Sequence, residues 1–304
     1  MDSSQVGYWI IFNAAVLVLL GLDLFVFQRK PHMVSLREAG LWSAFWVALS
    51  LAFNALIFFW KGREPALQFL TGYAIEKALS LDNIFVFLVI FEYFAVPQKY
   101  QHRVLFWGVL GALLMRGTMI YLGSALISRF DWILYLFGAF LLFTGLRMLR
   151  RGEIVQTPEQ NWAVRLARKC VRCTRAYHEG AFVVLENGKR VITPMALALI
   201  AVESTDLIFA LDSIPAIFGV TQDFLIVYTS NVCAILGLRA LYFVLAGLVR
   251  MLAYLKTSLA LVLSFIGIKM LIEHWIKIPI ELSLGVITLI LAGGVVTSLM
   301  KTKR

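Results

Sequence analysis

Nine long apolar segments dominate this chain and restrict it to folds that use lipid as part of their solvent. A helix that crosses a bilayer needs about 20 predominantly apolar residues, and each segment reaches or approaches that length. The runs are continuous, whereas strands of a membrane barrel show short alternations of apolar and polar residues. We therefore expect an all-α polytopic membrane protein with spans at 6–27, 41–60, 66–91, 104–125, 130–149, 193–218, 223–249, 257–275 and 280–299.

Charge and composition agree with this interpretation. The 304 residues are 61% hydrophobic and only 15% charged, whereas soluble domains are about half apolar and a quarter charged. The net charge of +10 need not indicate nucleic acid as a partner, because its placement reports topology. With the N-terminus outside, most basic residues fall on the cytoplasmic side, as the positive-inside rule requires. The partners expected from this pattern are the bilayer and its anionic headgroups. The outer side receives only Lys61, Arg63, Arg129 and Lys277.

A repeat is hidden in the apolar segments. Glu76 is followed six residues later by Asp82-Asn83, and Asp206 is followed six residues later by Asp212-Ser213. Two further landmarks recur in the same order in each half. They are Arg116 and Arg239, then Gly145-Leu-Arg-Met-Leu149 and Gly267-Ile-Lys-Met-Leu271.

The repeated unit contains three spans, and an odd number reverses the direction of the second copy. The sequence therefore predicts an inverted-topology pair, a plan that secondary transporters use with the ion site at the repeat interface. The alternative is an old duplication that now serves structure alone. The expected divisions are two N-terminal spans (1–63), the first repeat (64–149), a basic cytoplasmic loop (150–192), the second repeat (193–276), and a final span with its tail (277–304).

Six acidic residues fall inside the expected spans. A charged side chain at the centre of a membrane helix costs about 2.5–3.5 kcal/mol on insertion scales, so structure alone does not call for them. Asp23 lies outside the repeat, near the cytoplasmic end of its span, and is either a site residue or a carboxylate that reaches the interface. The six are Asp23, Glu76, Asp82, Glu203, Asp206 and Asp212.

The spacing of these acids constrains their geometry. Glu203 and Asp206 are three residues apart and share a helix face. Acids six apart are separated by about 240° on a regular helix, so they line different cavities unless the helix is interrupted. Pro215 removes a backbone hydrogen bond, and Asn83 and Ser213 offer competing side-chain oxygens. We therefore expect unwound or kinked segments near 80–84 and 210–215.

Carboxylate, amide and hydroxyl oxygens without thiolate or imidazole favour a hard divalent cation such as Mn²⁺, Mg²⁺ or Ca²⁺. Sodium ions and protons stay open as alternatives. The expected ligands are Glu76, Asp82, Asn83, Glu203, Asp206, Asp212 and Ser213. The basic residues in the same spans are expected to be structural partners or gates. The candidate gating or charge partners are Asp23, Lys77, Arg116, Asn231 and Arg239. Pure structural pairing of acids with bases is the competing interpretation.

No motif points to an enzyme or to a permanent cofactor. The chain lacks a phosphate-binding glycine loop and a nucleophile elbow, and an intramembrane hydrolase is disfavoured because no paired nucleophile and base stand out. Cys170 and Cys173 form a lone CxxC motif in the basic loop, which is a weak indication of a redox or metal site.

Both acidic motifs resemble the TerC family, and within it the Alx branch of bacterial inner-membrane proteins. The resemblance rests on Glu76-Lys-Ala-Leu-Ser-Leu-Asp-Asn-Ile-Phe-Val-Phe, on Glu203-Ser-Thr-Asp-Leu-Ile-Phe-Ala-Leu-Asp-Ser-Ile-Pro-Ala-Ile-Phe and on the segment from Ser230 to Phe243 that contains Asn231 and Arg239. It implies export of manganese, with a link to alkaline pH, through Glu76, Asp82, Asp206 and Asp212. Family names also imply tellurium resistance and a redox-modulator role.

These observations predict a secondary exporter of Mn²⁺ that exchanges the ion for protons. Neutralising two carboxylates would match the charge lost with one divalent ion. The rivals are a transporter of calcium or magnesium on the same scaffold, and a membrane-bound redox or stress-response factor that acts through Cys170 and Cys173. The expected location is the bacterial inner membrane, with the N-terminus outside and the C-terminus in the cytoplasm.

Overall fold

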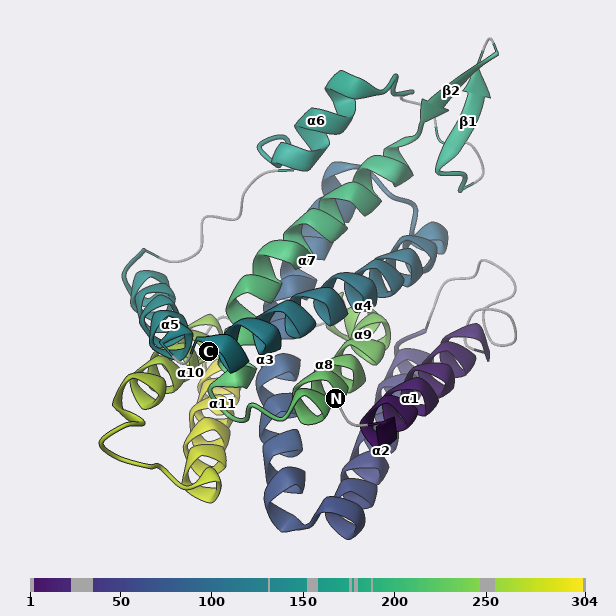
Figure 1. The fold of residues 1–304 in the computed structure, drawn as a ribbon. Coiled ribbons are helices and arrows are strands. Elements are labelled where there is room, and N and C mark those ends of the chain that lie inside the picture. Colours follow the sequence, from purple (N-terminus) through teal and green to yellow (C-terminus); the bar gives the residue numbers. More distant parts are fainter. Residues whose placement is uncertain are drawn as a thin grey trace.

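The structure is a computed structural model, and it is predominantly helical, with a short hairpin (Figure 1). It describes residues 3–22, 35–130, 132–151, 158–174, 177, 180–186, 188–246 and 255–302. Within these residues the helices are α1 (Ser3–Leu22), α2 (Leu36–Lys61), α3 (Arg63–Tyr93), α4 (Gln98–Arg129), α5 (Ile133–Arg151), α6 (Trp162–Cys170), α7 (Pro194–Phe218), α8 (Phe224–Leu236), α9 (Leu238–Ala246), α10 (Leu255–Ile272) and α11 (Ile280–Thr302).

Each of the nine apolar segments coincides with a helix or with a consecutive pair of helices. The number of spans is smaller by the criteria of length and hydropathy. Five described helices are long and apolar enough to cross a membrane: α2, α4, α5, α7 and α11. A sixth span results if α8 and α9, which meet at a 40° bend, count as one. The nine spans expected from the sequence are therefore not confirmed, and α3 falls short because it carries several charged side chains.

The interruptions that the sequence predicted are absent from the described helices. α3 is continuous through residues 80–84, and α7 is continuous through 210–215 with Pro215 inside it. Pro215 cannot donate a backbone hydrogen bond to the Leu211 carbonyl, yet α7 continues past it to Phe218. The chain breaks instead at Gly237, between α8 and α9.

The basic loop contains a short helix and a hairpin. The helix is α6, which Asn161 caps by accepting hydrogen bonds from the backbone of Ala163 and Val164. Strands β1 (Val183–Glu186) and β2 (Lys189–Ile192) pair antiparallel in a register that joins Val183 to Ile192. Gly188 has φ 74° in the connecting turn, a conformation that glycine adopts without strain.

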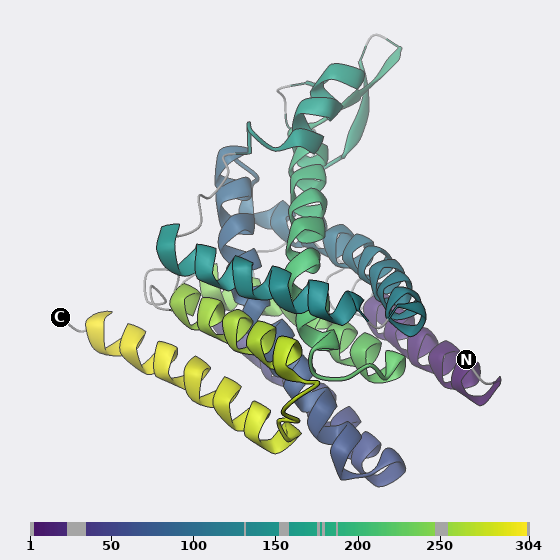
Figure 2. The same cartoon turned by 60° about the vertical axis from the view of Figure 1, so that its left-hand side comes forward.

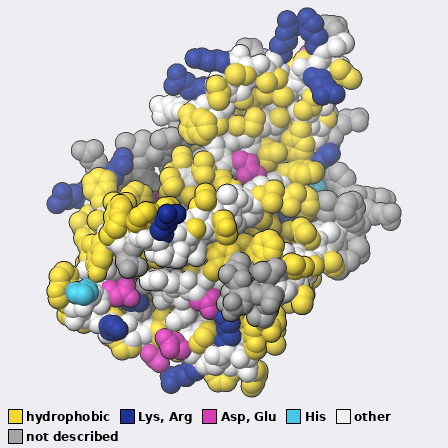
Figure 3. Space-filling view, in the orientation of Figure 1, with side chains coloured by type: hydrophobic (Ala, Val, Ile, Leu, Met, Phe, Trp, Pro, Cys, Tyr) yellow, Lys and Arg dark blue, Asp and Glu magenta, His cyan; other side chains and the backbone are white. Residues whose placement is uncertain are grey.

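Two central helices, α3 and α7, run in opposite directions through the bundle. The C-terminal end of α3 and the first turn of α7 line one cavity, so they lie at the same end of the molecule (Figure 1). α3 packs on α8 while α7 packs on α4, and α5 packs along α10 (Figure 2). In the space-filling view the visible face is largely hydrophobic, and Lys and Arg side chains gather at the end that carries α6 and the hairpin (Figure 3).

Glycines set the close approach of α5 and α10. A Cβ on Gly267 would lie 2.6 Å from the Leu142 backbone nitrogen, and one on Gly145 would lie 2.7 Å from the Ala260 carbonyl oxygen. Small residues at such contacts let membrane helices pack backbone to backbone. The two glycines are the equivalent positions of the sequence repeat, so each copy supplies the same device to this contact.

Candidate metal-ion site

A buried arginine joins the two halves of the chain. Arg116 of α4 donates from Nη1 to Glu76 of α3, and from Nε and Nη2 to the two carboxylate oxygens of Asp206 on α7, at 3.1 and 2.9 Å. All three side chains are almost fully buried. Buried charges persist when they are paired and hydrogen-bonded. Arg116 is therefore the ion-pair partner that both acids share between the helices, as a charge partner was expected to be.

Three uncharged polar side chains surround these three charged side chains. Asn231 of α8 donates to Glu76 Oε2 at 3.0 Å, and Asn83 donates to Asp206 Oδ1 at 3.4 Å. The hydroxyl oxygen of Ser213 accepts a hydrogen bond from Arg116 Nη1 at 3.2 Å. The centre thus combines residues of α3, α4, α7 and α8, and it includes half of the predicted ligands and partners.

A small cavity adjoins the Arg116 centre between α3, α7 and α10. Its volume is about 20 Å³, enough for one water-sized particle. Asp82 and Asp212 line it with Glu76, although Asp82 is displaced by 240° from Glu76 on the helix. A displacement of 240° is 120° in the other direction, and Leu79 fills the face between them. The expectation that acids six apart need an interrupted helix was therefore wrong. The complete lining is Glu76, Leu79, Asp82, Asn83, Arg116, Met148, Phe209, Asp212, Ser213, Leu259 and Leu263.

Several buried oxygens at this centre accept no hydrogen bond. They are Asp82 Oδ1, Asn83 Oδ1 and Asn231 Oδ1. The orientation of each amide is set by its NH₂ group, which donates to a carboxylate, so the oxygen is the atom left over. Buried acceptors without donors are costly. Oxygens of this kind at a cavity are the groups that a cation or an ordered water would satisfy.

A lysine outside the predicted set of site residues also reaches the site. Lys256, at the start of α10, places Nζ 3.4 Å from Asp82 Oδ1. Lys256 and the cavity-lining Leu259 and Leu263 are three and four residues apart in turn, which puts them on one face of α10. The Lys256 side chain is 35% exposed, whereas that of Asp82 is 6% exposed. Its position at the edge of an apolar segment gave no indication of this contact.

Of four other candidate residues, three lie outside the cavity and one lies outside the part of the chain that the structure describes. Glu203 is half-buried against Gly111 of α4, where any Cβ would collide with its carboxylate. Lys77 donates to the Ala234 carbonyl at 3.1 Å, beside the α8–α9 break. Arg239 lines a separate small cavity with Glu38 and Trp42. Asp23 lies outside the described residues.

The predicted ligands do not form one ready metal site. Within the described residues, no group of three or more His, Cys, Asp or Glu side chains is arranged to hold a metal ion. Two of the four repeat acids are occupied by Arg116 and a third, Asp82, by Lys256. This conformation therefore holds the acids together chiefly through the cations of the protein itself.

The CxxC motif is remote from the acids. Cys170 and Cys173 are exposed free cysteines at the end of α6 and just beyond it, and Cys173 Sγ lies 3.4 Å from the Val171 carbonyl. Partial desolvation raises the pKa of the Cys173 thiol, while the nearby Arg168 acts in the opposite direction. A raised pKa lowers the thiolate fraction, and thiolate is the reactive form.

Comparison with known proteins decides the family. The sequence model of the family described as "Integral membrane protein TerC family" matches residues 61–304. This chain belongs to the TerC family. The TerC-family chain is 50% identical to "Uncharacterized membrane protein STKORF319" of Myxococcus xanthus over 98% of this chain and 93% of that one. It is also 50% identical to "Putative membrane-bound redox modulator Alx" of Escherichia coli K12 and of Shigella flexneri, over 92% of this chain and 90% of each relative. No solved structure matches it.

The family match covers the whole acidic centre. Glu76, Arg116, Asp206 and Asn231 all lie within the matched residues, as does Lys256. The resemblance drawn from the two acidic motifs is thereby confirmed at the level of the family and of its Alx relatives. The protein is an integral membrane protein with several apolar helices.

Proposed function

We propose that this TerC-family protein is a secondary transporter that exports a divalent cation, Mn²⁺ in the first instance, through the acidic centre between α3 and α7. The observation that carries the proposal is the cavity of about 20 Å³ lined by Asp82, Asp212 and Asn83, where Asn83 Oδ1 accepts no hydrogen bond and Asp82 Oδ1 faces the partly exposed Lys256 ammonium at 3.4 Å. Hard oxygen ligands in a membrane interior favour Mn²⁺, Mg²⁺ or Ca²⁺ over softer metals. Intramembrane acids commonly mark ion pathways.

Charge assigns different tasks to the four repeat acids. Glu76 and Asp206 share Arg116, which offsets one of their two charges, and stay at the centre as a scaffold. Asp82 and Asp212 line the cavity and are not the carboxylates that this arginine pairs with. Two carboxylates carry the charge that balances one divalent ion, and Asn83 and Ser213 add neutral oxygens. We assign cargo binding to this second pair, with Lys256 displaced from Asp82 when the ion enters.

An inverted pair of units would give this site alternating access. The support is reciprocal packing, because α3 on α8 and α7 on α4 are the same contact if the first three-helix unit is laid on the second. The side chains follow a similar rule, since Asn83 bonds the acid of the other unit and Ser213 shares Arg116 Nη1 with Glu76. Inverted repeats place their ion sites at such an interface.

Proton exchange completes the proposed cycle. After release of the ion, protons on two carboxylates would restore neutrality in the low-dielectric site. Proteoliposomes loaded with a manganese-quenched dye test this step. At a fixed membrane potential, an imposed pH gradient should drive Mn²⁺ movement in the opposite direction. Movement that ignores the gradient would remove the proton part of the proposal.

Cellular manganese content under manganese stress tests the function as a whole. A strain without its own manganese exporters should hold less manganese when it carries this protein in its inner membrane. Asp82→Asn and Asp212→Asn should each abolish that effect. Glu92→Gln is the matched control, because Glu92 is exposed at the end of α3 and does not line the cavity. Unchanged manganese with the native chain at verified expression contradicts the assignment to Mn²⁺.

Two other functions have a specific basis. Calcium or magnesium would use the same oxygen ligands, and parallel uptake assays with each ion distinguish them. A redox role is favoured by the name of the Alx relatives and by the exposed cysteine pair. The double variant Cys170→Ser/Cys173→Ser separates the two: full manganese export by that variant argues against the redox role, and loss of function with dispensable acids argues for it.

A further inference from the structure

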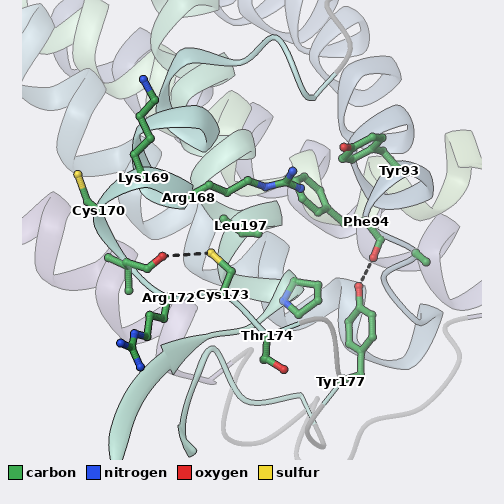
Figure 4. A pocket seen from close by; sticks show the side chains of 13 residues that line it. Tyr93, Phe94, Arg168, Lys169, Cys170, Arg172, Cys173, Thr174, Tyr177 and Leu197 are labelled. Atoms are coloured by element: carbon green, nitrogen blue, oxygen red, sulfur yellow. Dashed lines mark hydrogen bonds between the residues drawn. The ribbon is translucent and has the colours of Figure 1, made fainter.

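A concave site of a different kind lies at the end of the bundle where α3 ends and α7 begins (Figure 4). Its volume is about 820 Å³, within the range of small-molecule pockets and far larger than the acidic cavity. Tyr93 and Phe94 line it from the end of α3, and Pro194 and Leu197 from the first turn of α7. The remaining wall is the loop segment 168–174 together with Tyr177.

The charge of this pocket has one sign. Arg168, Lys169 and Arg172 line it, and none of its lining residues is acidic. In the close-up, Arg168 extends across the pocket toward Tyr93 and Phe94, while Lys169 and Arg172 flank it (Figure 4). The hydroxyl group of Tyr93 donates to Glu159 at 2.8 Å, so that carboxylate already has a partner. The pocket therefore attracts an anion, and its two arginines offer the planar fork that matches a phosphate group.

The surroundings are those of a membrane interface. Pro194 and Leu197 begin a helix that is long and apolar enough to cross the bilayer, so the pocket lies near the level of lipid headgroups. Phe94, Val171 and Leu197 give it apolar walls. On the adjoining α6, Trp162 and Leu166 are one turn apart and 57% and 53% exposed. An apolar stripe beside basic residues is typical of a helix that lies in the interface plane.

We propose that this pocket binds the headgroup of an anionic phospholipid, with the phosphodiester held by Arg168 and Arg172. A soluble phosphate compound would satisfy the same cations but would gain nothing from the apolar walls or from the position at the end of a span. The acyl chains would remain in the bilayer beside α3 and α7. The site is independent of the acidic centre, and it uses none of the proposed cargo ligands.

Native mass spectrometry of the purified full chain in detergent tests this assignment. Added phosphatidylglycerol should give a discrete adduct that phosphatidylcholine gives at least tenfold less often. The variant Arg168→Gln/Arg172→Gln should lower the fraction of adduct about tenfold. The matched control is Arg165→Gln/Arg190→Gln, which removes the same charge from exposed positions outside the pocket and should change the fraction less than twofold.

Each contrary result overturns the proposal in a recognisable way. An equal loss in both double variants would mean that binding follows net charge rather than the pocket. Equal adducts with the two lipids would exclude selectivity for an anion, and displacement of phosphatidylglycerol by millimolar inorganic phosphate would assign the site to a soluble ligand. Arg168→Lys keeps the charge but loses the fork, so an intermediate loss is expected even if the double variant folds poorly.

Discussion

Asn83 of α3 donates a hydrogen bond to Asp206 of α7 across the centre of the molecule, joining residues 123 positions apart. The related residue of the other half, Ser213 of α7, accepts a hydrogen bond from the Arg116 nitrogen that also bonds Glu76 of α3. The sequence repeat equates Asn83 with Ser213 and Glu76 with Asp206, so equivalent positions meet across the two halves, directly in one case and through Arg116 in the other. Each half of the chain therefore supplies a neutral polar group beside the acid of the other half. This relationship supports the proposal that the two units alternate around a shared site.

Arg116 should be the residue whose loss harms the fold most at this centre. Arg116→Gln leaves Glu76 and Asp206 buried beside each other without a cation, and breaking a buried ion pair by removing one partner costs about 3–5 kcal/mol. We expect a lower thermal unfolding midpoint in detergent and little folded protein. Thermal unfolding followed by tryptophan fluorescence measures the effect.

A second substitution distinguishes charge imbalance from lost packing. Glu76→Gln removes one of the two stranded charges, so Glu76→Gln/Arg116→Gln should unfold at a higher temperature than Arg116→Gln alone. Arg116→Lys keeps the charge but cannot bond both carboxylates, and it should fall between the native chain and Arg116→Gln. A double variant no more stable than the single one would argue that Arg116 acts mainly through its volume.

Lys256 should compete with the cargo for Asp82. The ammonium group lies 3.4 Å from Asp82 Oδ1 and is the more exposed partner, so an entering cation has to displace it. Lys256→Gln removes that competitor, and the KM for Mn²⁺ should fall about tenfold, which corresponds to about 1.4 kcal/mol. Initial rates of Mn²⁺ movement in proteoliposomes give the KM.

Two conservative variants serve as controls for the lysine. Lys256→Arg retains the cation and should leave the KM within a factor of two or three. Lys277→Gln removes a lysine at an exposed position beyond the end of α10 and should change nothing. An unchanged KM in Lys256→Gln would show that the lysine leaves Asp82 without cost.

The features that could be predicted from the sequence are those whose interacting residues lie close together along the chain. Periodicity and length predicted every apolar segment as helix, because those signals are local. The pairing of Asp82 with Lys256 could not be predicted, since a lysine at the start of an apolar segment has the same appearance whether it faces lipid headgroups or a carboxylate. The expected unwinding at Pro215 was wrong, because the loss of one backbone hydrogen bond does not end α7, which continues to Phe218.

The repeat gave more information than any single residue. It singled out Glu76, Asp82, Asp206 and Asp212, and all four line the cavity or bond to Arg116. It also singled out Arg116 and Arg239 as equivalents, yet Arg116 bonds Glu76 and Asp206, whereas Arg239 lines a separate cavity with Glu38 and Trp42. The difference follows from the break at Gly237, which bends the second copy two residues before Arg239. A repeat predicts equivalent positions, but it does not predict where one copy departs from the other.

Lys77 should stabilise that break. Its ammonium group donates to the Ala234 carbonyl in the last turn of α8, where the helix dipole favours a positive charge. Lys77→Met keeps the apolar stem and removes the donor, and we expect a loss of about 1.5–3 kcal/mol, the range for hydrogen bonds to charged groups. Hydrogen exchange should rise in residues 232–240 and stay unchanged in α5. Equal exchange in both regions would contradict a local role.

The contact between α5 and α10 should be the least tolerant of added volume. A Cβ on Gly267 would lie 2.6 Å from the Leu142 backbone nitrogen and 2.7 Å from the Gly138 carbonyl oxygen. These are main-chain atoms, which cannot move aside as a flexible side chain can, so Gly267→Ala requires the two helices to separate. Overpacking of this kind costs about 1–3 kcal/mol, and we expect a lower unfolding temperature.

Gly285 provides the control for that substitution, because it lies in the apolar helix α11 and a Cβ there meets no atom within 4 Å. Gly285→Ala should be neutral or slightly stabilising, since alanine has the higher helix propensity. Equal destabilisation by the two substitutions would contradict a specific backbone contact at Gly267. The equivalent position of the first repeat, Gly145, faces the Ala260 carbonyl oxygen at 2.7 Å. Gly145→Ala should therefore resemble Gly267→Ala, and the double variant should lose less than the sum because the first substitution has already separated the helices.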